Sequence, residues 1–169
     1  DFESTLTDIF SAFPSYANNI TIRQMLNHTS GLVDYESLIQ NDATEQVSDM
    51  DVYNMMTGLD STYFTPGTNY RYSNTGYALL AMIVEEKSGF TFAEFLEENI
   101  FLPLGINNSV AHQNGISTVS NRAYGYSQND GEYSRDDQSL TSAVLGDGGI
   151  YTSLKDMFHW DQSLYTDTL

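Results

Sequence analysis

The chain has 169 residues, of which 40% are hydrophobic and 13% aromatic; this is enough for one folded domain with a core and too few for two. Six basic residues face 23 acidic ones, so the formal net charge is −17, which argues against nucleic acid and anionic lipid as partners. The chain has no cysteine, which excludes a disulfide framework, a thiol nucleophile and a cysteine-based metal site.

The chain does not open with a basic and then apolar leader pattern. The longest apolar run, from Tyr77 to Val84, is far shorter than a membrane span, so we expect no membrane segment. The chain opens at Asp1 without an initiator methionine. We therefore expect it to be an internal piece of a longer protein.

The first part of the chain predicts short helices, each opening on a side chain that can cap free amides. Ser4 or Thr5 opens the first helix, which Pro14 ends. Capping patterns open the next two, at Thr21 with Gln24 and at Ser48 with Asp51. The second helix breaks at residues 28–32, and the third runs to Gly58.

The stretch Pro66–Tyr77 is a polar turn that leads directly into an apolar helix. Proline followed by glycine is typical of a tight turn. Downstream, Tyr77, Leu80, Ile83 and Val84 recur at helical spacing and predict the buried face of a helix that ends at Gly89. The turn is therefore predicted to be held between a tight corner and a buried helix, a common setting for functional groups.

The helix that follows opens with a capping box at Thr91 and Glu94 and is predicted to stop before Pro103. It should pack with the preceding helix as an αα pair around a tight glycine joint. Between residues 107 and 139 helical periodicity is lost, and Asp130-Gly131 predicts a small hairpin.

Residues 146–149 read Gly-Asp-Gly-Gly and predict a close backbone approach, before Ser153 caps a last helix. The run could be mistaken for a phosphate loop, but it lacks the lysine and the glycine spacing of one. The predicted fold class is mainly α with minor β, and we find no internal repeat.

The histidines do not form a recognisable metal motif. His28, His112 and His159 lie far apart in the sequence without ligand spacing. We therefore expect no metal and no cofactor. His28, at a helix-ending turn, is predicted to be a hydrogen-bonded structural residue.

Tyr72 and Asn74 carry the most chemical content. A phenol has a reference pKa of about 10, so Tyr72 can act as a base near neutrality only if neighbouring cations stabilise the phenolate. Beside a serine and a lysine it could relay a proton to a leaving group. Asn74 can orient a substrate carbonyl. The tripeptide alone is weak, because a turn tyrosine packed on the core is the commoner case.

Several segments in the same order strengthen this interpretation. These are the runs Ile20–Leu32, Pro66–Tyr77, Phe101–Gly105, and Gly148–Ser153 with Asp156. Over roughly residues 5 to 165 the chain resembles the serine β-lactamase and penicillin-binding-protein-like hydrolases, specifically the class C β-lactamase, D-aminopeptidase and esterase branch. The resemblance implies that Tyr72 is the catalytic proton-transfer tyrosine of a Tyr-x-Asn motif and that Asn74 binds the substrate. Ser73 is the variable middle position, to which no role is assigned.

Two motifs of the family are missing. Its enzymes carry a Ser-x-x-Lys nucleophile upstream of the His-Thr-Ser-Gly-Leu turn and a Lys-Thr-Gly or His-x-Gly strand far downstream. Lys87 and Lys155 are preceded at that spacing by Val84 and Thr152. We therefore expect residues 1–169 to be one partial domain, the helical subdomain of a β-lactamase/transpeptidase-like α+β fold.

The resemblance implies that the parent protein is a serine hydrolase that cleaves an amide, lactam or ester through an acyl-enzyme, and that this chain alone is inactive. The alternative is a non-catalytic β-lactamase-like module that binds peptidoglycan or a protein partner. A Ser-x-x-Lys ahead of residue 1 would favour the enzyme, and its absence the binding module.

The expected partner of the full-length protein is a small-molecule or peptide substrate, and the resemblance implies a periplasmic or extracellular location. Helix faces that normally cover a sheet should be exposed in this chain. We therefore expect it to self-associate through those faces or to bury them by rearrangement.

Overall fold

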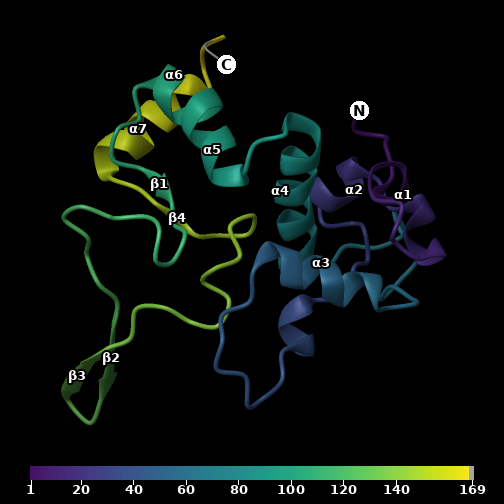
Figure 1. Cartoon of the computed structure of the whole chain (residues 1–169), viewed down its shortest axis with the longest axis horizontal. Helices are drawn as coiled ribbons and strands as arrows, with labels where there is room; N and C mark the ends of the chain where they lie inside the picture. Colours follow the sequence, from purple (N-terminus) through teal and green to yellow (C-terminus); the bar gives the residue numbers. More distant parts are fainter. Residues whose placement is uncertain (168–169) are drawn as a thin grey trace.

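The computed structural model describes residues 1–167 and places helix α4 (Asn74–Ser88) between two groups of helices (Figure 1). The first group comes from the N-terminal part of the chain and comprises α1 (Leu6–Ile9), η1 (Ser15–Asn19), α2 (Ile22–Leu26), η2 (Tyr35–Leu38) and α3 (Asp49–Thr57). The second group comprises α5 (Phe92–Leu96), η3 (Glu97–Phe101), α6 (Leu102–Leu104) and α7 (Leu154–Ser163). Helices α2, α3 and α5 all contact α4 directly.

The predicted helix starts are confirmed, because each cap is a local pattern of side-chain and backbone hydrogen bonds. Capping boxes form at Thr5, Thr21, Ser48 and Thr91. In each, the hydroxyl accepts a hydrogen bond from the backbone amide three residues later, and the side chain of that later residue accepts one from the backbone amide of the cap residue. Each cap typically contributes about 1 kcal/mol to helix stability. Gly89 ends α4 in the left-handed conformation, with φ of 76°, as expected for a helix C-terminus.

The predicted buried face of α4 was partly wrong. Of the predicted residues only Ile83 is buried; Tyr77, Leu80 and Val84 are half-buried. The fully buried residues are instead Thr75, Ala78 and Leu79. The helix is covered on more than one side, by the N-terminal helices and by the loop at Gly146. Small side chains therefore take the positions of closest approach.

The predicted end of the next helix before Pro103 was also wrong. The helical path continues from α5 through the wide π-type turn of η3 into α6, with Pro103 in the first turn of that last segment. A proline is tolerated there because the first amides of a helical segment need no intrahelical acceptor. The path ends at Gly105, whose φ is 67°.

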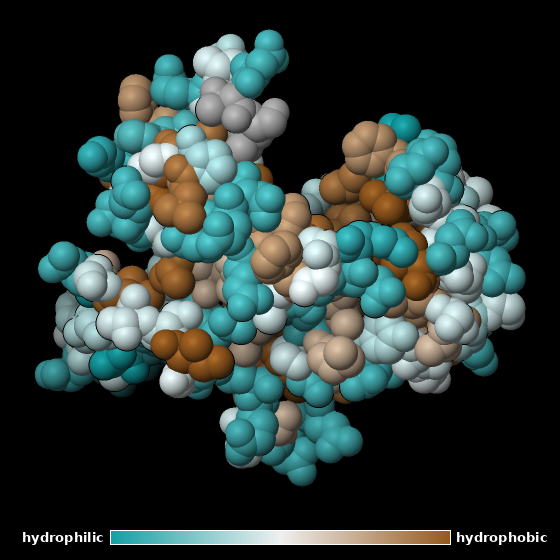
Figure 2. Space-filling view, turned by 45° about the horizontal axis from the view of Figure 1, so that its top comes forward, coloured by the Kyte–Doolittle hydropathy of each residue, from teal (hydrophilic) through white to brown (hydrophobic). Residues whose placement is uncertain are grey.

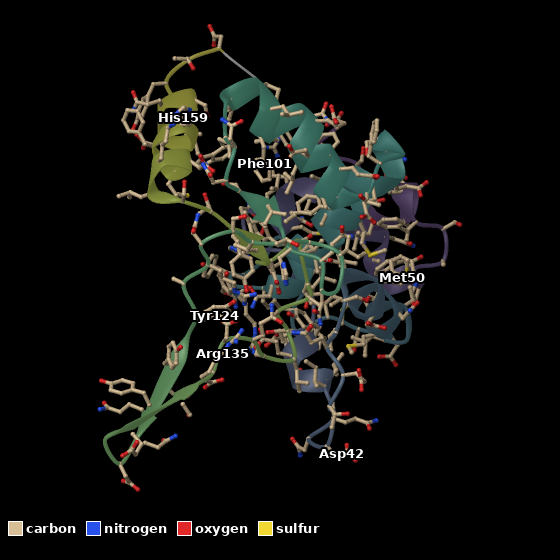
Figure 3. All side chains as sticks on the ribbon, turned by 60° about the vertical axis from the view of Figure 1, so that its left-hand side comes forward. Asp42, Met50, Phe101, Tyr124, Arg135 and His159 are labelled. Carbon is tan, nitrogen blue, oxygen red and sulfur yellow. The ribbon has the colours of Figure 1, made fainter. Side chains whose placement is uncertain are left out.

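The strands within residues 1–167 form two small antiparallel pairs. Strands β2 (Tyr126–Asn129) and β3 (Glu132–Arg135) form the predicted hairpin around Asp130 and Gly131, which both have positive φ. Figure 3 shows Tyr124 and Arg135 at the base of this projecting hairpin, where the guanidinium lies 3.7 Å from the ring centroid. Strand β1 (Val110–Ala111) pairs with β4 (Ile150–Tyr151). The mainly helical prediction with minor β is confirmed.

The buried core lies between α4 and the N-terminal helices, around Leu6, Met25, Val52 and Leu79. Helix α7, in contrast, exposes apolar side chains: Leu154 is 91% and Phe158 is 62% exposed. Figure 2 shows hydrophobic residues at the surface on both the left and the right side of the view. An apolar cavity of about 390 Å³ separates α7 from η3 and is lined by residues such as Trp160 and Ile100.

Candidate functional site

The start of α4 presents Tyr72 and Asn74 to solvent while Ser73 points inward. Ser73 is 3% exposed, and its hydroxyl caps the helix by accepting a hydrogen bond from Gly76 N at 3.2 Å. Its backbone is extended, with φ of −146° and ψ of 110°, and neighbours on either side of such a residue share a face. Tyr72 is 63% exposed and Asn74 is half-buried. A buried cap thus sets the direction of the two predicted site residues.

The turn at residues 28–32 is joined to the segment that leads into this site. Its carbonyl oxygens accept hydrogen bonds from the amides of Tyr63, Gly67 and Arg71 at 2.8 to 3.0 Å. Gly31 has φ of +73°, and a Cβ there would lie 2.5 Å from the Phe64 carbonyl oxygen. Backbone hydrogen bonds therefore join two motifs that are separated in the sequence, and the last of them lies next to Tyr72, at Arg71.

His28 is hydrogen-bonded to the segment that leads into α4, through Ser73 and Arg71. This confirms the prediction of a hydrogen-bonded structural residue. Its Nδ1 accepts a hydrogen bond from the Ser73 amide at 3.3 Å. The imidazole packs on the Tyr72 ring with 4.5 Å between centroids and on the Tyr77 ring at 5.3 Å. Its own φ is 61°. His28 thus supports both the cap residue and the predicted catalytic tyrosine.

The Asn74 amide is held by a residue that the sequence did not single out. Asn74 Nδ2 donates a hydrogen bond to Glu36 Oε1 at 2.9 Å. The neighbouring Thr75 is fully buried; its hydroxyl donates to Val33 O at 2.8 Å and accepts from the Tyr35 amide at 2.9 Å. These contacts fix η2 against the first turn of α4. Because Glu36 binds the nitrogen of the Asn74 side chain, its Oδ1 can accept a hydrogen bond from a ligand.

The loop at residues 144–149 packs against α4 at Tyr77, Ala78 and Ala81, just beyond the turn that holds Asn74. A Cβ on Gly146 would lie 2.3 Å from Tyr77 O and 2.8 Å from the Ala78 Cα, which confirms the predicted close approach. The carboxylate of Asp49 accepts hydrogen bonds from Leu145 N at 2.8 Å and Gly146 N at 3.0 Å.

Asp147, in the same loop, accepts a hydrogen bond from the Tyr35 hydroxyl at 2.8 Å. Burial raises the pKa of its carboxyl to about 6, and repulsion from Asp49 and Glu36 acts in the same direction. Burial likewise raises the pKa of Asp49 and moves the pKa of the Tyr35 phenol well above its usual value. The carboxylates of Glu36, Asp49 and Asp147 therefore lie close enough together for the first two to raise the pKa of the third.

The lysines lie on helices outside this cluster. Lys87 is in the last turn of α4, about 20 Å along the helix axis from Asn74, and Lys155 is in the first turn of α7. Among residues 1–167, no group of three or more His, Asp or Glu side chains is arranged to hold a metal ion. Within the described residues, no helix has the length and apolarity needed to cross a membrane.

Sequence reasoning missed Glu36, Tyr35, Thr75 and Asp147 as parts of this cluster. Their contacts join residues 38 to 112 positions apart, so no local spacing reveals them. The cap role of Ser73 had a local signal, since a serine directly before an apolar helix is a common N-cap.

Comparisons with known proteins identify similar sequences. The beta-lactamase family model matches residues 3–168. Penicillin-binding protein 4* of Bacillus subtilis (strain 168) is 37% identical over 163 residues, which cover 88% of this chain and 36% of that protein. D-aminopeptidase of Brucella canis is 32% identical over 146 residues, which cover 83% of this chain and 27% of that protein.

Solved structures share the fold. A penicillin-binding protein from Bacillus halodurans matches with a TM-score of 0.82 and 30% identity, covering 100% of this chain and 52% of that one. D-amino acid amidase from Ochrobactrum anthropi SV3 matches with a TM-score of 0.81 and 22% identity, over 98% of this chain and 49% of that one.

The chain spans about a third of the length of these curated relatives and about half of these solved chains. Within that span it carries the ordered motifs, the helix caps and the polar cluster described above. The chain belongs to the beta-lactamase family.

Proposed function

We propose that this chain is the helical part of a serine hydrolase that cleaves an amide, lactam or ester through an acyl-enzyme. The observation that carries the proposal is the outward pairing of Tyr72 and Asn74 on a helix start whose cap, Ser73, is buried. Family membership and the names of its relatives, a penicillin-binding protein and a D-aminopeptidase, support the reaction class.

In the proposed mechanism Tyr72 transfers a proton between the attacking serine and the leaving group. An exposed phenol does this near neutral pH only when a cation stabilises its phenolate. The serine and lysine of a Ser-x-x-Lys motif would supply the nucleophile and that cation. Because no such motif is present in the 169 residues, we expect the chain alone to be inactive.

Asn74 has the complementary role of orienting the substrate. Its amide nitrogen is engaged by Glu36 at 2.9 Å, so the side chain is held in one orientation. Its oxygen can then accept a hydrogen bond from an N–H of the substrate. This arrangement fits an amide or peptide substrate with a donor beside the scissile bond.

The test compares this chain with a complete protein that includes its flanking segments, using nitrocefin, a p-nitrophenyl ester and a D-amino acid amide. We expect turnover and a covalent acyl adduct, seen by mass spectrometry, only with the complete protein. Tyr72→Phe should lower its kcat by about 10²- to 10⁴-fold. Tyr126→Phe is the matched control, because Tyr126 is 61% exposed on the distant hairpin.

Robust turnover by this chain alone would refute its expected inactivity. A complete protein without a Ser-x-x-Lys ahead of residue 1, and without an acyl adduct, would refute the hydrolase. It would favour the binding module, which a sedimentation assay with isolated peptidoglycan would then detect.

We also expect the hydrolase to act in the periplasm or outside the cell, as its family resemblance implies. Immunoblotting of cytoplasmic and extracytoplasmic fractions checks this, and recovery of the complete protein only from the cytoplasm would contradict it.

A further inference from the structure

A chain of hydrogen bonds connects the Asn74 end of α4 to the glycine-rich loop. It starts at Thr75, whose hydroxyl accepts the Tyr35 amide at 2.9 Å. It continues through the Tyr35 side chain to Asp147 Oδ2 at 2.8 Å. Tyr35 and Thr75 are both fully buried and Asp147 is half-buried, so the Thr75 contact is shielded from water and the Asp147 contact is partly shielded.

The same residue is connected to the Asn74 amide by its neighbour in sequence. Tyr35 and Glu36 are the first two residues of η2, and Glu36 binds Asn74 Nδ2. A single turn of 3₁₀ helix carries both residues, so a movement of the Tyr35 backbone also moves the backbone of Glu36.

The far end of the path is sensitive to charge. Asp147 faces the Tyr35 phenol, and the carboxylates of Asp49 and Glu36 repel its negative charge. Asp49 is in turn repelled by Glu85 of α4. When ionised, Asp147 accepts a charge-assisted hydrogen bond from the phenol; when neutral, it is a weaker acceptor.

We propose that Tyr35 is a positioning residue for Asn74, and that its bond to Asp147 couples the orientation of the Asn74 amide to the loop at residues 144–149. The proposal rests on the proposed function in so far as Asn74 contacts substrate. The physical link between Asp147 and Asn74 is a property of this chain and is tested without catalysis.

The first experiment follows two NMR signals of this chain against pH: the Asp147 carboxyl carbon and the Asn74 side-chain amide. Because burial raises the pKa of Asp147 to about 6, we expect an inflection near that pH in both signals. Tyr35→Phe removes a hydrogen bond that lowers this pKa. The Asp147 inflection should therefore move to higher pH, and the Asn74 signal should lose it.

Two further variants separate a specific link from a general loss of packing. Asp147→Asn keeps an oxygen acceptor but cannot titrate, so the shared inflection should disappear from the Asn74 signal. Tyr16→Phe is the matched control, because the half-buried Tyr16 hydroxyl donates to Met56 O at 2.8 Å in another part of the core. It should leave both inflections in place.

The absence of the inflection from the wild-type Asn74 signal, or its persistence in Tyr35→Phe, would overturn the proposal. In the complete hydrolase, Tyr35→Phe should lower kcat/KM by up to about 100-fold and shift its pH profile, whereas Tyr16→Phe should not. If the complete wild-type protein hydrolyses nothing, the proposed function fails, and the NMR result alone then decides the link.

Discussion

Among the glycines with positive φ in the described part of the chain, Gly31 is the one where an added methyl group would meet the closest neighbour. Its φ is +73°, and a Cβ would lie 2.5 Å from a backbone oxygen, Phe64 O. Both the backbone conformation and the contact penalise any other residue. We expect Gly31→Ala to lower the free energy of unfolding by roughly 2–4 kcal/mol, as measured by urea denaturation.

Gly89→Ala is the matched control for this substitution. Gly89 also has a positive φ, +76°, but nothing lies within 4 Å of its added Cβ. Gly89→Ala should lower the free energy of unfolding by only about 1 kcal/mol, because only the backbone conformation penalises it. Equal losses in the two variants would contradict the close packing of the 28–32 turn.

Asp147 should make the stability of the folded chain depend on pH. Burial raises the pKa of this carboxyl from 3.8 to about 6, so the folded state binds the proton more tightly than the unfolded state. The stabilisation from protonation is complete below about pH 4 and is lost as the pH rises through about 6. Asp147→Asn should remove this loss.

From about pH 4 to about pH 6 and above, the free energy of unfolding of the wild type should fall by roughly 1–2 kcal/mol more than that of Asp147→Asn. The difference is small because solvent screens the half-exposed carboxyl. Urea denaturation at a series of pH values measures it. Other carboxyls, such as Asp51, have a lowered pKa and lose stability on the acid side in both proteins. Parallel pH curves for the two proteins would contradict the assignment to Asp147.

At the level of elements, the cap of α4 determines both helix stability and site geometry. Ser73→Ala removes the acceptor for Gly76 N, and we expect a loss of about 1 kcal/mol in the free energy of unfolding. Because Ser73 lies between Tyr72 and Asn74, the backbone amide signals of both neighbours should also shift in NMR spectra.

Ser153→Ala is the control for this element. Ser153 caps α7 by accepting a hydrogen bond from Asp156 N at 3.1 Å. Among the described residues, no hydrogen bond joins α7 to the segment around Tyr72. It should cost a similar amount of stability and leave the Tyr72 and Asn74 signals unchanged. A shift of those signals in Ser153→Ala would show that the change is not specific to the cap.

The elements themselves were largely predictable, because caps and stop signals act within one turn of helix. Thr21 with Gln24 and Ser48 with Asp51 each bind across three residues. The helical path through Pro103 was not predictable by the same rule, since the wide turn of η3 depends on how α5 and α6 pack. The buried face of α4 also depended on which segments cover it.

At the scale of the whole molecule, α7 leaves apolar surface uncovered. Leu154 is 91%, Phe158 62% and Leu164 64% exposed. Such a surface favours association with another protein surface. We expect a concentration-dependent sedimentation coefficient for this chain, and expect Phe158→Glu to return it toward the monomer value.

Tyr133→Glu is the control for association, because Tyr133 is 70% exposed on the hairpin away from α7. It should change the sedimentation behaviour little. A compact monomer at every concentration, without binding of an apolar dye, would contradict exposure of this face in solution.

The sequence by itself determined the helix starts, the glycine-dependent turns, the hairpin and the family, because these depend on short patterns and on motifs in order. It also pointed to Tyr72 and Asn74. Only the tertiary structure decided what holds them: the buried cap of Ser73, the His28 stack, and the contacts of Glu36 and Tyr35. The bond from Tyr35 to Asp147 joins residues 112 positions apart, and such a contact exists only once folding has brought the loop onto α4.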